Sequence, residues 1–188
     1  MPGPRTVPYR HGVHFYEDHA SLCRMVGRFL AEGLVSGDPA VVVATPEHQA
    51  QIVPELQRNR IDVRAAQHEG TLVVLDADDT LGVCMIDGTP DPELFGAYIG
   101  TVLTQLRRIK PTATVRAYGE MVDLLWRNGQ TEAAIKLEIH WNALASRYRF
   151  SLLCGYAMGH FYKEPEAYAR VCAQHTDVRR FDPASLRS

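Results

Sequence analysis

Residues that are capable of acid–base chemistry gather around two predicted elements. Glu120 follows a predicted strand directly after Gly119, and Glu138 and Asn142 lie four residues apart on one face of a predicted helix. A buried carboxylate needs a hydrogen-bonding or charged partner. The sequence therefore indicates a polar cluster, which is either a structural network that fixes helix to sheet or the polar part of a ligand pocket with aromatic walls.

Several side chains qualify as partners of these carboxylates: Arg116, His14, Asn142 and Tyr156. His14 with Glu120 or Glu138 would supply metal-ligand types, whereas His11 and His14 point to opposite faces of one strand and are a poor pair of ligands. We expect a polar cluster without a metal, and we expect no cofactor. Cys154 lies in the apolar stretch SLLCGY, where a thiol without an evident base is typical of packing.

The stretch HGVHFYEDHASLCRMVGRFL predicts a strand that runs directly into an amphipathic helix. Nucleotide-binding proteins place a glycine-rich phosphate loop at such a junction, but no glycine or lysine lies between Phe15 and Met25. Glu17 and Asp18 would repel a triphosphate at this helix end, where Asp18 is a plausible N-cap. The junction thus argues against ATP hydrolysis and leaves His14 and Tyr16 as one wall of a pocket.

The apolar periodicity predicts alternating strands and helices. Strands are expected over 11–16, 40–45, 62–67, 71–77, 113–120 and 150–156, and helices over 19–35, 46–58, 121–129, 130–148 and 164–176, with a further long helix that begins near Pro92 after the loop DGTPD. Asp76 is expected to be a strand-end or turn residue. This alternation favours an α/β fold of three layers, in which helices cover both faces of a mostly parallel sheet. We expect a flexible lead-in over 1–10, one domain over 11–176 and a polar tail over 177–188.

Composition narrows the classes of function. The chain has 188 residues, of which 46% are hydrophobic, and a formal net charge of −2, which argues against direct nucleic-acid binding. No apolar run is long enough to span a membrane or to act as a signal peptide. The four cysteines form no CxxC pair, so we expect reduced thiols and a cytoplasmic protein.

Three stretches are similar to one known family: HGVHFYEDHASLCRMVGRFLAEGLVSGDPAVVVATPEH, RAYGEMVDLLWRNGQTEAAIKLEIHWNALA and FSLLCGYAM. They resemble the MEDS domain, a sensory domain named for methanogen and methylotroph regulators that include the regulator DcmR. The resemblance covers about 10–176 and implies a core like that of RecA or KaiC without its nucleotide loop. It also implies that the domain binds small organic molecules and passes the signal to a DNA-binding, histidine-kinase or anti-sigma module. The strongly patterned family positions are His14, Phe15, Tyr16, Gly119, Glu120, Trp126, Glu138, Trp141, Asn142, Cys154 and Tyr156.

Together these observations predict a stand-alone, non-enzymatic sensory domain for signal transduction or transcription regulation. It would bind a small organic ligand and act through a regulatory protein partner, such as a kinase, an anti-sigma factor or a DNA-binding protein, with a homodimer as a further possibility. The predicted ligand-binding residues are His14, Tyr16, Glu120, Trp126, Glu138, Trp141, Asn142 and Tyr156. Two alternatives stay open: an enzyme that uses Glu120 or Glu138 as general base, and a protein-interaction scaffold.

Overall fold

Six parallel strands form the central sheet of the computed structural model, which describes residues 10–148, 150–162 and 164–180. The strand order is β3-β2-β6-β7-β1-β8. The strands are β1 (His11–Tyr16), β2 (Ala40–Ala44), β3 (Leu72–Asp76), β6 (Arg116–Gly119), β7 (Ser151–Ala157) and β8 (Asp177–Arg180). β1 and β2 are buried along their whole length, as expected for parallel strands that are covered on both faces.

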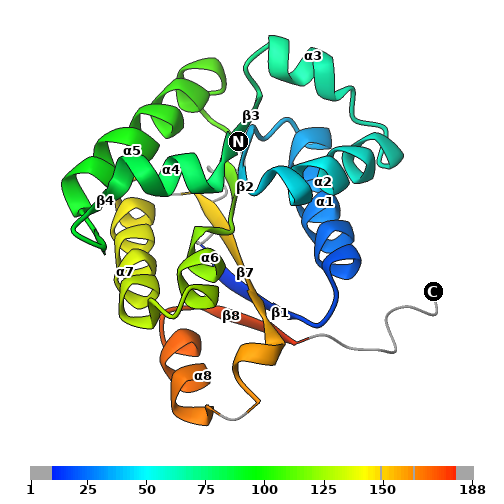
Figure 1. Ribbon diagram of the computed structural model, residues 1–188. Helices are drawn as coiled ribbons and strands as arrows, with labels where there is room; N and C mark the ends of the chain where they lie inside the picture. Colours follow the sequence, from blue (N-terminus) through cyan, green and yellow to red (C-terminus); the bar gives the residue numbers. More distant parts are fainter. Residues whose placement is uncertain (1–9, 149, 163, 181–188) are drawn as a thin grey trace, which may run out of the picture.

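Helices cover both faces of this sheet (Figure 1). One face carries α4 (Ala77–Cys84), α5 (Pro92–Ile109), α6 (Met121–Arg127) and α7 (Thr131–Tyr148), and the other carries α1 (His19–Val35), α2 (Pro46–Arg58) and α3 (Val63–His68). α8 (Pro165–Cys172) follows the 3-10 turn Met158–His160 and packs against the core of the first group. The predicted three-layer α/β fold is therefore confirmed, whereas the likeness to RecA and KaiC stays a prediction.

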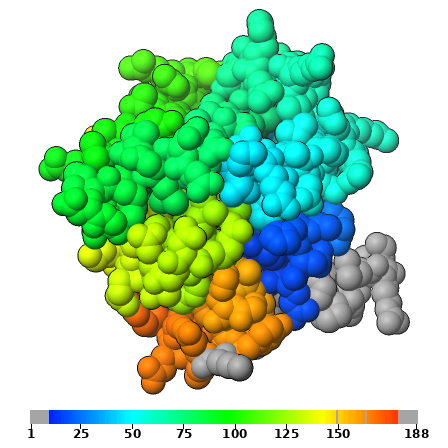
Figure 2. All heavy atoms as spheres, viewed as in Figure 1, coloured from blue at the N-terminus to red at the C-terminus, as the bar shows by residue number. Residues whose placement is uncertain are grey.

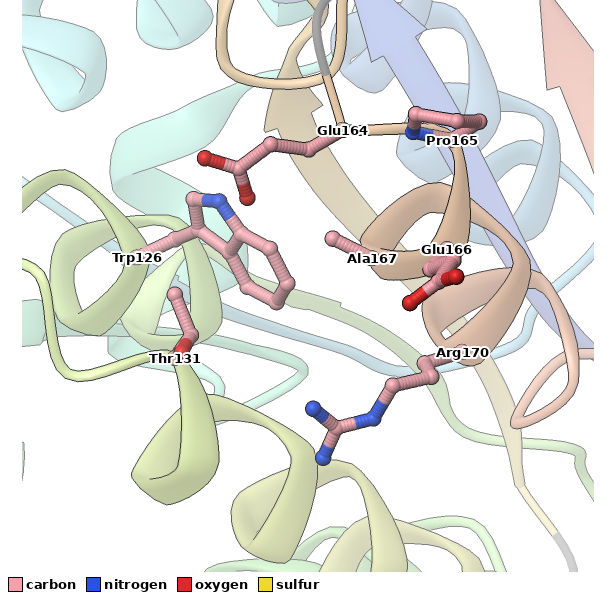
Figure 3. Close-up of a pocket in the computed structure, with 7 residues that line it drawn as sticks. All are labelled: Trp126, Thr131, Glu164, Pro165, Glu166, Ala167 and Arg170. Carbon is pink, nitrogen blue, oxygen red and sulfur yellow. The ribbon is translucent and has the colours of Figure 1, made fainter.

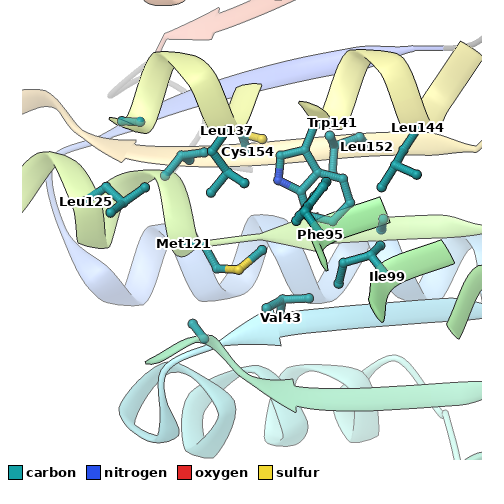
Figure 4. Close-up of a cluster of buried hydrophobic side chains, with 14 of the residues drawn as sticks. Val43, Phe95, Ile99, Met121, Leu125, Leu137, Trp141, Leu144, Leu152 and Cys154 are labelled. Atoms are coloured by element: carbon teal, nitrogen blue, oxygen red, sulfur yellow. The ribbon is translucent and has the colours of Figure 1, made fainter. Parts of the chain in front are cut away.

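Trp141 of α7 is the centre of the larger core (Figure 4). Its side chain is fully buried, and its ring meets Phe95 of α5 edge to face, with 4.9 Å between the ring centroids. A Cβ atom at Gly119 would lie 3.3 Å from Cζ2 of Trp141. The absence of a side chain at Gly119 thus lets α7 pack closely against the end of β6.

Two expectations between Ile61 and Asp91 were wrong or incomplete. The strand predicted over 62–67 is the helix α3, whose N-cap Asp62 accepts a hydrogen bond from the backbone N–H of Ala65 at 3.0 Å. A short apolar run does not distinguish strand from helix by periodicity alone. The helix α4 was not predicted, although Asp76 ends β3 as expected and caps this helix. The loop DGTPD includes the turn of a small hairpin, β4 (Met85–Ile86) with β5 (Thr89–Pro90).

The predicted polar tail begins with a strand. β8 pairs in parallel with β1, so that Gly12 lies opposite Asp177, and the last helix ends at Cys172 rather than at 176. A four-residue strand with two arginines carries too little apolar pattern to be distinguished from a tail. Residues 1–9 of the predicted lead-in over 1–10, and the rest of the predicted tail, 181–188, lie outside the described residues. Within the described part, none of the helices has the length and apolar character that a bilayer crossing requires.

Replacing Asp18 with alanine is expected to lower the free energy of unfolding by about 1 kcal/mol at neutral pH. The Asp18 carboxylate caps α1 by accepting a hydrogen bond from the backbone N–H of Ser21 at 2.7 Å. This bond lowers the pKa of Asp18, so its contribution is present above the usual pKa of about 4 and fades as the pH falls through the lowered value. Urea unfolding at pH 7 and pH 3 measures both effects. Asp18→Ser keeps a capping oxygen, and an equal loss in that variant would contradict the capping role.

Candidate functional site

The carboxyl ends of four parallel strands place a polar network at one edge of the sheet. β1 ends at Tyr16, β2 is followed by Thr45, β6 is followed by Glu120 and β7 ends at Ala157. We call the edge cluster the set Tyr16, His19, Thr45, His48, Glu120, Asp123, Arg127 and His160. Open parallel sheets bind their ligands outside this edge. The edge cluster therefore occupies the region in which the sequence predicted a site.

Glu120 connects β2, β6, α2 and α6. Its side chain is 1% exposed, and Oε2 accepts a hydrogen bond from the backbone N–H of Thr45 at 3.0 Å. Oε1 lies 2.8 Å from Nδ1 of His48 and accepts a bond from a terminal N–H of Arg127 at 3.3 Å. Because a backbone donor and two basic side chains hold the carboxylate, Glu120 is an anchor of this edge.

Asp123 is the second buried carboxylate of the edge cluster. Its Oδ2 accepts a hydrogen bond from the hydroxyl of Tyr16 at 2.9 Å, and its Oδ1 accepts one from the backbone N–H of Ala157 at 2.9 Å. Nε of Arg127 lies 3.2 Å from Oδ2. Burial raises the pKa of Asp123, and the Ala157 N–H and Arg127 offset part of that rise. Burial and Asp123 also raise the pKa of Tyr16, which therefore remains a neutral donor.

Two histidines connect Glu120 to the protein surface. Nδ1 of His19 lies 2.6 Å from Nε2 of His48, and Nδ1 of His48 faces Glu120. His19 is exposed, whereas His48 is 1% exposed. His19 is thus hydrogen-bonded to His48, and His48 makes an ion-pair contact with Glu120, so the three side chains form a continuous line of polar contacts from the surface to the buried carboxylate.

A second polar group lies between β1, β7 and α7. We call the inner cluster the set His11, Glu138, Asn142, Cys154, Tyr156 and His175. Glu138 is fully buried, and its Oε1 accepts a hydrogen bond from the Tyr156 hydroxyl at 2.9 Å. Burial by itself raises the pKa of Glu138, but His175 and His11 outweigh that effect and hold the pKa well below its usual range. Glu138 is thus a carboxylate anion in this cluster.

The structure divides seven of the eight predicted ligand-binding residues among four places. Tyr16 and Glu120 belong to the edge cluster, whereas Glu138, Asn142 and Tyr156 belong to the inner cluster. Trp141 lies in the hydrophobic core and Trp126 lines a surface cavity.

Two predicted partners lie elsewhere. His14 is buried on the face of β1 opposite to His11, and it is His11 that contacts Glu138. The prediction that Arg116 pairs with one of the buried carboxylates is wrong. Its guanidinium binds the carbonyl of Phe29 and lies within 3.7 Å and 3.9 Å of Glu32 and Asp38.

The cavity that Trp126 lines has a volume of about 420 Å³. On the surface, the orange atoms around α8 lie against the green-yellow atoms of α6 and the start of α7 (Figure 2). The lining residues are Trp126, Thr131, Glu164, Pro165, Glu166, Ala167 and Arg170, and Ala167 points from α8 toward the Trp126 ring (Figure 3). The Trp126 ring packs on Tyr156 with 5.6 Å between the centroids, so the wall of the cavity connects to the inner cluster.

The sequence did not point to His48, Asp123, Arg127 or His175 as site residues. One signal was present for two of them, because Asp123 and Arg127 lie four residues apart on the helix that directly follows Glu120. His48 and His175 had no such signal. His48 lies on the helix after β2 and His175 lies just before β8, and the positions of these two strands in the sheet were not predicted.

Residues 10–176 match one protein family over nearly the whole described fold, the MEthanogen/methylotroph, DcmR Sensory domain, or MEDS. The chain belongs to the MEDS family. Curated proteins offer no match to the sequence. MEDS is a family of sensory domains, which supports a sensory role for this one. In this MEDS domain Asp18 caps α1, whereas Glu17 accepts a hydrogen bond from the Tyr162 hydroxyl at 3.0 Å.

Thiol reactivity of this MEDS domain is expected to be confined to Cys172. Cys23, Cys84 and Cys154 are buried, and Cys172 is partly exposed. Burial raises the pKa of Cys84 to about 11 and, together with Glu120, that of Cys23 to about 12, while burial and Glu138 raise that of Cys154. Titration with Ellman's reagent at pH 8 should therefore modify one thiol in the folded protein and four in urea. Fast reaction of a second thiol in the folded protein would contradict this assignment.

Proposed function

We propose that this MEDS domain senses a small organic molecule that binds in the cavity beside Trp126, and that it passes the signal to a regulatory protein partner. The observation that carries the proposal is the cavity itself. Its volume of about 420 Å³ falls within the range of small-molecule sites, and an aromatic ring forms one wall. The site differs from the strand-end wall of His14 and Tyr16 that the sequence suggested.

The lining suggests the chemical class of the ligand. Trp126, Pro165 and Ala167 supply apolar surface, and the Thr131 hydroxyl supplies one neutral hydrogen-bonding group. Arg170 does not offer a free cation, because its guanidinium binds both carboxylate oxygens of Glu132 at 2.6 Å and 2.8 Å. Glu164 and Glu166 add two carboxylates to the lining. A neutral or positively charged molecule with an apolar part therefore suits this lining better than an anion.

The short helix α6 offers a route from the cavity to the surface of the edge cluster. Trp126 faces the cavity, while Asp123 and Arg127 of the same helix hold the edge cluster together with Glu120 at its N-terminus. A ligand that moves α6 would change the contacts of Arg127, which is 36% exposed. Signalling requires that the ligand bind one arrangement of α6 more tightly than another.

Fluorescence tests the proposed cavity, because Trp126 and Trp141 are the two tryptophans of the chain. In Trp141→Phe all tryptophan emission comes from Trp126, and halomethanes, short-chain alcohols and monocyclic aromatic hydrocarbons are suitable probes. We expect at least one class to change this emission with saturation. Ala167→Phe fills the cavity and should abolish the change while the melting temperature is retained. Saturable binding that is unaffected by Ala167→Phe would contradict this location.

The protein partner and the cellular location are further parts of the proposal. The sensory character of the family supports a cytoplasmic regulator that acts on a kinase, an anti-sigma factor or a DNA-binding protein. The enzyme alternative has less support, because Glu120 and Glu138 belong to different clusters, are 1% and 0% exposed, and neither lines the cavity.

A further inference from the structure

Four side chains of metal-ligating type converge inside the domain from four separate places in the chain. His11 comes from β1, Glu138 from α7, Cys154 from β7 and His175 from the segment between α8 and β8. Their candidate ligand atoms all lie within 4.8 Å of one another. The side chains of His11, Glu138 and His175 are 0% exposed, and Cys154 is fully buried.

Hydrogen bonds fix the orientation of both histidines. Nδ1 of His175 lies 2.7 Å from the carbonyl oxygen of Val171, and a carbonyl only accepts, so this nitrogen carries a proton. Nδ1 of His11 lies 2.9 Å from Oδ1 of Asn142. The Asn142 amide donates through Nδ2 to the carbonyl of Gln174 at 3.0 Å, which fixes Oδ1 as the acceptor for His11.

A neutral imidazole that donates through Nδ1 has a lone pair on Nε2. Nε2 of His11 faces Oε2 of Glu138 at 3.2 Å, and Nε2 of His175 faces Oε1 of the same carboxylate at 3.4 Å. Lone pairs on both sides of a carboxylate repel it, so the cluster requires positive charge. A metal ion supplies that charge to all four side chains at once. A second proton on His175 alone would leave the Nε2 lone pair of His11 facing Oε2 of Glu138, and a second proton on each ring would place two cations side by side, with 4.1 Å between the ring centroids.

The spacing agrees with tetrahedral coordination. Zinc bonds of about 2.0–2.1 Å to nitrogen or oxygen and about 2.3 Å to sulfur place neighbouring ligand atoms about 3.3–3.6 Å apart. Nε2 of His11 lies 3.2 Å from Oε2 of Glu138 and 3.3 Å from Sγ of Cys154, and that sulfur lies 3.4 Å from Oε2. A thiolate and a carboxylate also neutralise a divalent ion, which a fully buried site requires.

From this geometry we propose that His11, Glu138, Cys154 and His175 bind one divalent ion of the zinc class as a closed structural site. Cys154 loses its thiol proton to solvent when the ion binds. Asn142 and the Val171 carbonyl orient the two histidines, and the Tyr156 hydroxyl holds Glu138 Oε1, which leaves Oε2 for the metal. This site differs from the metal-free polar cluster that the sequence suggested, and it is independent of the ligand proposed for the cavity.

Cobalt substitution tests the site in the full chain. The protein is unfolded with chelator, refolded with Co²⁺, and compared with Cys154→Ser, His175→Gln and the control Cys84→Ala, which removes a buried cysteine outside the inner cluster. We expect one ion per chain, the visible bands of tetrahedral cobalt and a sulfur-to-cobalt charge-transfer band in wild type and in Cys84→Ala. Cys154→Ser should lose the charge-transfer band, and both cluster variants should bind Zn²⁺ at least about tenfold more weakly in competition with a chromophoric chelator.

The wild-type protein alone decides the outcome if the variants do not fold. Zn²⁺ should raise the melting temperature of the metal-free wild type, because the ion binds the folded state. A wild type that refolds to its native circular dichroism, yet shows no charge-transfer band and no zinc-dependent melting shift, would overturn the proposal and leave a proton-linked ion pair between His175 and Glu138.

Discussion

Glu120→Ala is expected to lower the free energy of unfolding by about 3–5 kcal/mol, the range for breaking a buried ion pair by removing one partner. The change leaves the backbone N–H of Thr45 without its acceptor and His48 without its carboxylate. The guanidinium of Arg127 is partly exposed to solvent, so the loss of its ion pair with Glu120 costs less free energy than the loss at the buried His48. Urea unfolding followed by circular dichroism measures the effect.

Glu120→Gln is the matched control for this change. An amide oxygen still accepts from the Thr45 N–H, whereas the charge that faces His48 and Arg127 is lost. We expect a destabilisation of about half that of Glu120→Ala, because an unsatisfied buried donor adds its own desolvation cost. Two variants with equal losses would show that the backbone bond contributes little and would contradict the anchoring role.

Trp141→Ala is expected to cost about 3–5 kcal/mol through the cavity that it leaves in the core. The ring is fully buried and is in contact with Phe95, Phe150 and the backbone at Gly119. Urea unfolding followed by circular dichroism is the suitable measurement, because the substitution removes a fluorophore.

Trp141→Phe separates the effect of lost ring volume from the effect of a lost polar contact of the indole N–H. Nε1 of Trp141 is buried and has no hydrogen-bond partner among the described residues, so phenylalanine loses ring volume but no polar contact. We expect a cost below about 2 kcal/mol. A loss as large as that of Trp141→Ala would show that the indole makes a contact beyond packing.

Most helices and strands could be predicted because their signals are local. The helix His19–Val35 has an N-terminal cap, an apolar stripe and a glycine stop, and the strand Ala40–Ala44 is a continuous buried run. The helix Val63–His68 was mistaken for a strand because six residues are too few to show a period. The strand Asp177–Arg180 forms only because β1 offers a free edge, which local sequence does not encode.

The clusters could be predicted only in part, because strand order decides which side chains meet. The sequence named Tyr156 as a candidate partner of the buried carboxylates, and in the structure its hydroxyl does bind Glu138. His48 reaches Glu120 because β2 and β6 are neighbours, and no pattern within either strand shows that. His11 was set aside as a ligand because its strand neighbour His14 faces the other way, although its actual partners lie on α7, on β7 and after α8.

The pairing of β8 with β1 has a consequence for how the chain folds. The N–H of His11 bonds to the hydroxyl of Thr176 across a separation of 165 residues. Contacts of such high sequence separation carry a large loop-closure entropy and slow the folding of a domain. During synthesis the edge of β1 therefore remains without β8 until nearly all the described residues have left the ribosome, and an open edge of this kind invites pairing with other chains. A truncated protein that ends before Asp177 should aggregate more than a protein that retains β8.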